Sequence, residues 1–317
     1  MPFSHHSHSG EFCGHAANTL AEVVEHAVQR RKMSTFALTE HCPRGDDDLY
    51  PEEAAQHNAA SLAALFDAFI VEAVRLQQQV HAASSAPGAA QCEILIGFEA
   101  EWIRPAASTA IAQKLLAQHG GTIDFFIGSV HHVGTVPIDF DRALYERARR
   151  MCGGSDAALF AAYFDAQLEM LEALRPRVVG HFDLIRLFAD APDEDLRAAA
   201  GGALWPKVLR NLSAARGMGA LLELNTSALR KGLAQPYPRL EICRAWMAIG
   251  GQFVLSDDSH GIAQDVADTS RPKAARFNLQ LPQLESRLSL AVPPPKAAVW
   301  DAQNCKTPVD RDKADDE

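Results

Sequence analysis

The sequence predicts an α/β fold in which parallel strands alternate with helices around a single barrel. Short β-rich segments recur along the chain with helical stretches between them, which is the order of βα units. The β-rich segments are apolar almost throughout, as strands buried on both faces should be. Seven strands are therefore expected, at residues 1–6, 34–39, 92–99, 122–131, 177–183, 220–225 and 252–258.

The helices between these strands follow from capping signals and apolar stripes. The clearest helix is expected over residues 18–32, where Thr19 and Glu22 have the spacing of a capping box. An apolar stripe runs along it, formed by Leu20, Val23, Val24, Ala27 and Val28. Residues 54–81 indicate a long helix or a helix pair, and the small and turn-forming residues 82–88 indicate a loop.

The chain is expected to form one barrel-sized domain followed by a tail. Of 317 residues, 47% are hydrophobic, which is enough for a large core. The domain is expected to span residues 1–292 and a mobile tail residues 293–317, which open with three prolines and close with an acidic run. Residues 46–53 are expected to cover the rim of the site, and residues 190–202 form a second excursion.

Charge and cysteine usage narrow the classes of function. The formal net charge of -10 comes without a basic stripe, so we expect neither nucleic-acid binding nor a membrane partner. Six cysteines are spread along the chain without paired spacings, which favours reduced thiols over a disulfide scaffold. No signal peptide or apolar span is visible, so a cytoplasmic protein is expected. The sequence does not specify an oligomeric state.

Histidines and carboxylates gather at the ends of the predicted strands. In a parallel barrel these ends converge on one mouth, so residues distant in sequence can form one cluster there. Imidazoles and carboxylates together suit zinc, iron or manganese. The pairs His6/His8 and Asp258/His260 each place two side chains on one side of an extended chain. The strand-end set is His6, His8, His15, His41, Glu99, His131, His181, Asp258 and His260.

Seven segments of the chain also resemble a known family. They are residues 4–16, 38–41, 97–101, 128–132, 180–186, 223–231 and 255–260, and they occur in the same order as the motifs of PHP-family histidinol phosphatases. The resemblance covers about residues 3–261. The segments around Asn225 and His181 point to this branch more specifically than the shared metal motifs do.

The resemblance implies a distorted (β/α)7 TIM-like barrel that holds three divalent transition-metal ions, with zinc, iron and manganese all compatible. It implies that Glu99 bridges two of these ions, and that Glu99, Asp258 and His260 act in catalysis. The implied ligand sets are His6, His8, Glu99 and Asp258 for the first ion, Glu99, His131 and His181 for the second, and His15, His41 and His260 for the third.

The implied reaction is the hydrolysis of L-histidinol phosphate in histidine biosynthesis. Arg186 and Arg230 are candidate phosphate clamps, because a guanidinium can meet two phosphate oxygens at once. Each could equally be part of a structural ion pair. Lys231 is a third, weaker candidate for the phosphate.

Histidinol carries an ammonium and an imidazole, so a carboxylate near the mouth should bind its nitrogen groups. Glu101, Asp139 and Asp183 are the candidates, although Asp183 could instead orient His181. Two other functions stay open. One is a related phosphoesterase that acts on nucleotides or another small phosphate ester, and the other is a metal-binding barrel without catalytic activity.

Overall fold

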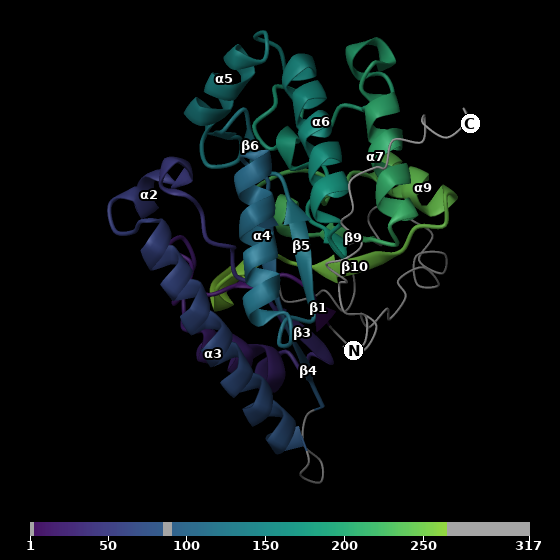
Figure 1. The fold of residues 1–317 in the computed structure, drawn as a ribbon. Helices are drawn as coiled ribbons and strands as arrows, with labels where there is room; N and C mark the ends of the chain where they lie inside the picture. The colour runs from purple at the N-terminus through teal and green to yellow at the C-terminus, as the bar shows by residue number, and fades with distance from the viewer. Residues whose placement is uncertain (1–2, 85–90, 265–317) are drawn as a thin grey trace, which may run out of the picture.

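A seven-stranded parallel sheet forms the centre of the molecule. The computed structural model describes residues 3–84 and 91–264. Within them the strand order is β1-β3-β4-β5-β8-β9-β10, so neighbours in the sheet follow one another along the chain (Figure 1). The strands are β1 Phe3–Ser4, β3 Thr35–Leu38, β4 Glu93–Glu101, β5 Phe125–Ser129, β8 Val178–Val179, β9 Leu221–Asn225 and β10 Phe253–Ser256.

The two edges of this sheet approach each other, so the barrel is nearly closed. The backbone N–H of His5, just after β1, donates a hydrogen bond of 3.1 Å to the carbonyl of Leu255 in β10. Just beyond these strands, β2 Ser7–His8 pairs in parallel with β11 Ser259–His260. All seven predicted strands are confirmed, and so is the distorted (β/α)7 barrel.

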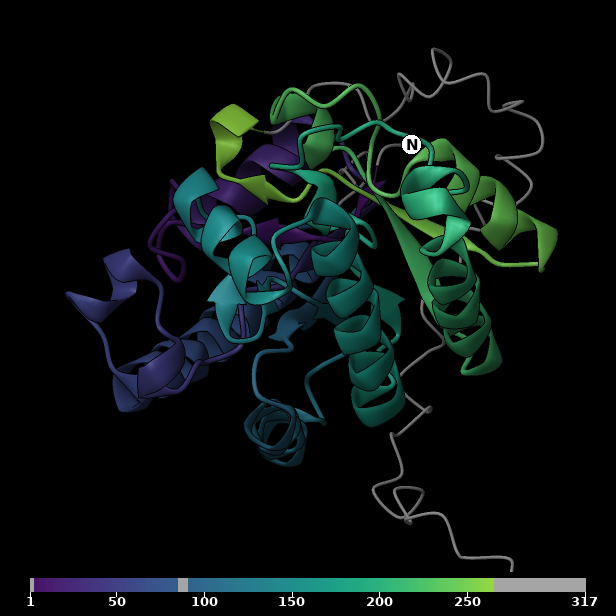
Figure 2. The same ribbon diagram turned by 90° about the horizontal axis from the view of Figure 1, so that it is seen from above.

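Helices lie outside the strands and connect them. Figure 2 shows them around the sheet when the molecule is seen from above. A short hairpin, β6 His132–Val133 with β7 Val136–Pro137, follows β5. The α-helices are α1 Leu20–Glu25, α2 Pro51–Ala54, α3 Ala59–Ser84, α4 Pro105–His119, α5 Arg142–Met151, α6 Asp156–Leu174, α7 Trp205–Gly217, α8 Ser227–Arg230 and α9 Leu240–Ala248. Short turns of 3-10 helix cover Asp46–Asp48, Leu184–Arg186, Ala199–Gly202 and Ile262–Gln264.

The capping box predicted at Thr19 and Glu22 starts α1, which continues as a π-helical segment over His26–Arg30. The predicted helical stretch 54–81 consists of the end of α2, a break and the long α3. Most of the predicted loop 82–88, and the whole predicted tail 293–317, lie outside the described residues. The predicted domain boundary at residue 292 also lies there and stays a prediction.

The inside of the barrel changes from apolar to polar along the strands. A small hydrophobic cluster fills its lower part, formed by Ala37, Leu95, Phe125, Ile127, Val178, Leu221 and Val254. Side chains on a strand alternate with period two, so Leu95 and Glu99 in β4 point to the same side. Glu99 therefore lies above the apolar cluster, at the mouth that the carboxyl ends of the strands form. The large core between strands and helices is separate from this cluster.

Among residues 3–84 and 91–264, no helix combines the length and the apolar character that a membrane crossing requires.

We predict that Gly97→Ala destabilises the protein, because strand β4 passes close to its neighbour at this residue. A Cβ atom at Gly97 would lie 2.7 Å from the carbonyl oxygen of Phe125, and backbone cannot swing away as a side chain can. The free energy of unfolding in urea should fall by about 1–3 kcal/mol. Gly217→Ala is the control, since its Cβ would meet nothing within 4 Å. Equal unfolding midpoints for the two variants would contradict this prediction.

Candidate metal centre

Glu99 lies between two groups of histidines at the mouth of the barrel. Its Oε1 atom is 3.0 Å from Nε2 of His181 and 3.3 Å from Nε2 of His131. Its Oε2 atom is 3.2 Å from Nε2 of His6 and 3.5 Å from Nε2 of His8. Only 1% of Glu99 is exposed. One carboxylate thus offers a separate oxygen to each group, which is the geometry of a bridging ligand.

Two clusters of donor atoms form around Glu99. The first cluster is His6, His8 and Glu99, and the Nε2 atoms of its two histidines are 3.1 Å apart. Oδ1 of Asp258 is 3.8 Å from His6 and 3.5 Å from His8.

The second cluster is Glu99, His131 and His181, and the Nε2 atoms of its two histidines are also 3.1 Å apart. Imidazole lone pairs directed at one another would repel, so a cation between them fits both clusters.

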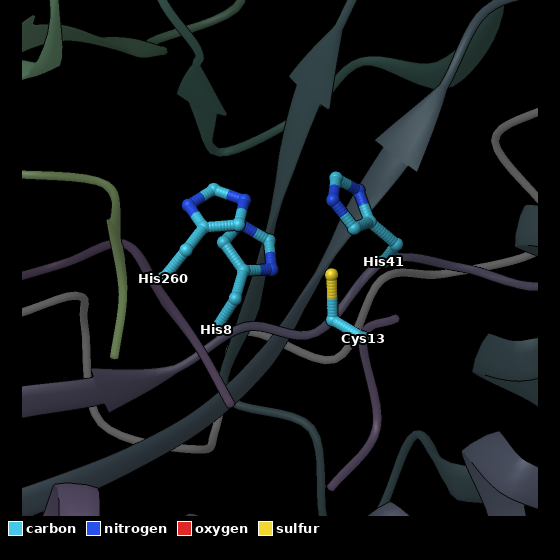
Figure 3. Close-up of side chains that lie close together, drawn as sticks. All are labelled: His8, Cys13, His41 and His260. Carbon is cyan, nitrogen blue, oxygen red and sulfur yellow. The ribbon is translucent and has the colours of Figure 1, made fainter. Parts of the chain in front are cut away.

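A third cluster lies beside the first. It consists of His8, Cys13, His41 and His260, whose donor atoms all lie within 4.8 Å of one another (Figure 3). The ring of His15 is adjacent, with its centroid 4.9 Å from that of His260. All nine strand-end residues predicted from the sequence thus gather at one mouth. Cys13 was missed, because nothing in its spacing distinguishes it from a buried structural cysteine.

A second layer of acceptors fixes the orientation of the imidazoles. Nδ1 of His6 is 2.7 Å from Oε1 of Glu223, and the other oxygen of Glu223 accepts a 2.6 Å hydrogen bond from the backbone N–H of His181. Nδ1 of His260 is 3.1 Å from the carbonyl oxygen of Asp258. When Nδ1 donates its proton outward, Nε2 keeps a lone pair directed into the site. Glu223 lies in the family-like segment 223–231, but its spacing does not reveal this orienting role.

The buried charges of the site shift the pKa values of its carboxylates and histidines in different directions. Burial alone would raise the pKa of Glu99, but the nearby His6 and His131 hold this pKa well below its usual value. Burial and the neighbouring His8 keep the pKa of His260 well below its usual value. For His6 and His131, the neighbouring carboxylates outweigh the effect of burial and raise the pKa above its usual value. Metals bind ionised carboxylates and neutral imidazoles, so metal binding at these two histidines would release a proton.

Glu101 does not line the pocket but contacts His41, one of the clustered histidines. Both it and Glu53 accept hydrogen bonds from the buried guanidinium of Arg44. Oε1 of Glu101 is 3.2 Å from Nδ1 of His41. Glu101 therefore orients His41 and connects it, through Arg44, to helix α2.

Asp183 and Arg186 form a buried network away from the pocket. Oδ2 of Asp183 lies 3.1 Å from Nε of Arg186 and accepts a 2.9 Å hydrogen bond from Nε of Arg239. Arg186 also donates to the carbonyl oxygens of Gln235 and Pro236, at 2.7 and 2.8 Å. Both terminal nitrogens of its guanidinium donate to oxygens of the protein, and Arg186 does not line the pocket over the metal centre.

Arg230 and Lys231 are placed differently although they are adjacent in sequence. Arg230 donates hydrogen bonds of 2.5 and 2.8 Å to the carbonyl oxygens of Asp257 and Asp258. It therefore braces the segment that carries Asp258 and His260. Lys231 lines the pocket over the metal centre.

This pocket has a volume of about 300 Å³ and opens over the three clusters. Its lining also includes Tyr50 and Glu52, at the start of α2, and Asp139 and Phe140, after the β6–β7 hairpin. The rings of Tyr50 and Phe140 stack with centroids 5.7 Å apart. Oδ1 of Asp139 is buried and has no hydrogen-bond partner. Tyr50 and Glu52 both lie within the predicted rim segment 46–53.

Comparison with known families explains this arrangement. The model of the PHP domain matches residues 4–227. The chain belongs to the PHP-domain family. A PHP-domain relative from Schizosaccharomyces pombe, named "Probable histidinol-phosphatase", is 40% identical over 82% of this chain and 81% of its own length. The "Histidinol-phosphatase" of Saccharomyces cerevisiae is 33% identical, and the match covers 89% of each chain.

A solved structure shares the fold of this PHP-domain protein. It is the histidinol phosphate phosphatase of Lactococcus lactis, crystallised with zinc, L-histidinol and phosphate. The TM-score is 0.58 at 18% sequence identity, and the match covers 90% of this chain and 93% of the other. The sequence-based assignment to PHP-family histidinol phosphatases is thereby confirmed.

We predict that Glu223→Gln weakens metal binding without unfolding the protein. The amide has one acceptor oxygen in place of two, so it cannot accept both from Nδ1 of His6 and from the backbone N–H of His181. The His6 imidazole then loses orientation, or the backbone that carries His181 shifts. Loss of such an acceptor typically costs about 10–100-fold in metal affinity, which competition with a zinc chelator measures. Glu241→Gln is the control, because burial already raises the pKa of Glu241 and this carboxyl lies apart from the clusters. Unchanged zinc affinity in Glu223→Gln would refute the orienting role.

Proposed function

We propose that this protein hydrolyses L-histidinol phosphate to L-histidinol and phosphate with three divalent metal ions held at the mouth of its barrel. The observation that carries the proposal is the bridging position of Glu99, with one oxygen toward each histidine pair. Relatives named as histidinol-phosphatases at 33–40% identity support the reaction. The expected location, the cytoplasm, and the step in histidine biosynthesis follow from the same assignment.

The ligand sets implied by the motifs overlap with the clusters of donor atoms, although the third cluster contains His8 and Cys13 with His41 and His260, and His15 lies beside it. We assign His6, His8, Glu99 and Asp258 to the first ion, Glu99, His131 and His181 to the second, and His15, His41 and His260 to the third. The first two clusters share Glu99, and a third cluster lies beside them. This arrangement supports three ions rather than one, since nine ligands exceed what one ion can use. Zinc is the metal of the solved Lactococcus lactis structure, and iron and manganese suit the same donors.

Divalent ions bound there would neutralise charge on the phosphate and supply a hydroxide nucleophile near neutral pH. The protein's own part is to hold these ligands in place. Glu223 keeps the Nδ1 proton of His6 directed outward, and Ser129 donates a 2.5 Å hydrogen bond to Oε1 of Glu99. Arg230 holds the backbone at Asp258, a residue with a φ of 49° that strains any side chain but glycine.

Lys231 is the side chain that we assign to the phosphate, because it is the cation that lines the pocket within the described residues. Lys231 is thereby favoured for the phosphate over Arg186 and Arg230, the first two candidates named from the sequence. Arg186 and Arg230 are engaged by carbonyl and carboxylate oxygens of the protein, so the structural reading is favoured for both. Their effect on catalysis would be indirect, through the segments they brace.

The nitrogen groups of the substrate would meet Asp139 and Glu52. Both carboxylates line the pocket, Oε1 of Glu52 lies 3.6 Å from Nδ1 of His15, and the buried oxygen of Asp139 lacks a partner. The stacked rings of Tyr50 and Phe140 offer an aromatic surface for the imidazole. Of the three candidates named from the sequence, Asp139 is thus favoured over Glu101 and Asp183, which other residues engage.

We predict more than one transition-metal ion per chain in protein purified without chelators. Glu99→Gln should lower both metal content and turnover sharply, because it weakens two ions at once. Elemental analysis alongside activity assays tests this. The control is Glu72→Gln, at a carboxylate on α3 that pairs with Arg75 far from the clusters. One metal ion or fewer under metal-replete conditions would overturn the three-ion centre.

We predict that Asp139→Asn selectively impairs the hydrolysis of L-histidinol phosphate. Loss of a charge-assisted hydrogen bond to the ammonium costs about 1.5–3 kcal/mol, or roughly 10–100-fold in kcat/KM. p-Nitrophenyl phosphate lacks the ammonium, so its kcat/KM should stay within about twofold. Asp67→Asn, at an exposed carboxylate on α3, is the control variant.

The same assay decides between the proposed reaction and its alternatives. The wild-type protein should prefer L-histidinol phosphate over nucleotides. If a nucleotide is hydrolysed equally well, the related phosphoesterase function is correct. If no ester is hydrolysed by metal-loaded protein, the barrel binds metals without catalysis.

A further inference from the structure

The sulfur of Cys13 lies inside the third cluster. Figure 3 shows it directed into the space that the rings of His8, His41 and His260 border. The four donor atoms lie within 4.8 Å of one another, so they surround a point that an ion can occupy. Nδ1 of His260 faces a backbone carbonyl and leaves Nε2 for such an ion. Nε2 of His41 is buried without a hydrogen-bond partner.

A buried cysteine usually serves as a small hydrophobic side chain, and other cysteines of this chain do so. Cys42 and Cys243 belong to the main hydrophobic core. Cys13 is equally buried, with 6% exposed, but within the described residues it belongs to neither hydrophobic cluster. Its sulfur instead lies 3.5 and 3.3 Å from Nδ1 and Nε2 of His15. Its surroundings are those of a ligand.

The backbone fixes the position of this sulfur. The N–H of Cys13 donates a 2.9 Å hydrogen bond to the carbonyl of Ser9, and its carbonyl accepts a 3.0 Å bond from the N–H of Ala16. The loop is packed closely on itself, since a Cβ atom at Gly10 would lie 2.8 Å from the carbonyl oxygen of Ala16. The thiol is therefore held beside the imidazoles by a compact turn.

We propose that Cys13 is a ligand of the third metal ion, bound as a thiolate in addition to His15, His41 and His260. The proposal rests on the metal centre of the proposed function. On binding, the S–H bond breaks, the proton passes to solvent, and a sulfur lone pair forms the bond to the metal without any change in oxidation state. Thiolate is a soft donor, so this position selects zinc or iron(II) over manganese.

Cobalt(II) provides a readout that does not depend on turnover. Metal-depleted protein is titrated with cobalt(II), and a thiolate ligand gives an intense near-ultraviolet charge-transfer band. The wild-type protein should show this band as the third site fills. Cys13→Ser should lose it while keeping the visible bands of cobalt bound by nitrogen and oxygen. Cys152→Ser is the matched control, because Cys152 is half-buried at the end of α5, and it should keep the band.

Absence of the band from the wild-type protein, or its persistence in Cys13→Ser, overturns the proposal. Hydrolysis of L-histidinol phosphate by the wild-type protein is assayed separately, so an active enzyme without the band leaves the proposed function intact. If the metal-loaded enzyme shows the band but does not hydrolyse L-histidinol phosphate, Cys13 is a ligand and the proposed function is wrong. The two failures are thereby distinguished.

A second measurement needs no variant and so does not depend on whether Cys13→Ser folds. X-ray absorption at the zinc edge of the zinc-loaded wild-type protein should require a sulfur neighbour at about 2.3 Å. A fit complete with nitrogen and oxygen neighbours alone rejects Cys13 as a ligand. In chelator competition, Cys13→Ser should also lose at least about 10-fold in affinity for the weakest zinc ion.

Discussion

The rest of the site depends on one buried negative charge, the carboxylate of Glu99. A charge removed from water is tolerated only when other groups compensate for it, and here the five imidazoles of His6, His8, His41, His131 and His181 lie within 3.5 Å of the carboxylate. The apolar cluster around Leu95 closes the barrel below the carboxylate, so compensation must come from the strand ends above it. This explains why the polar side chains are confined to one mouth. It also explains why Glu223 is needed behind His6.

The strands and the ligand positions were predictable because they depend on local pattern. An apolar run followed by His, Glu or Asp indicates both a buried strand and the side chain at its end, as in β4 with Glu99. Partner choice was not predictable. Arg186 carries a charge that suits phosphate, but the carbonyls of Gln235 and Pro236, which are distant in sequence, surround it. The same holds for Cys13, whose proposed role depends on His41 and His260, which come from two other segments.

Arg44 contacts both the pocket lining at Tyr50 and a residue that supports the metal centre, Glu101. Arg44 binds Glu53, which belongs to the helix after Tyr50, and it binds Glu101, which contacts His41. Its guanidinium also lies 4.7 Å from the centre of the Tyr50 ring. A shift of α2 would thus change the position of His41 through the ion pairs of Arg44 and Glu101. Recognition of the alcohol part of the substrate and positioning of a metal ligand are therefore mechanically linked.

The pairing of β2 with β11 has a consequence for the order in which the centre is built during synthesis. Ser4 donates a hydrogen bond to Asp257, a residue 253 positions later, and His8 lies opposite His260. The second cluster needs only Glu99, His131 and His181, so its residues emerge from the ribosome well before the others are complete. The first and third positions wait for the last barrel strand. With the ligand sets proposed above, the second position could therefore be completed before the barrel closes, whereas the first and third could not.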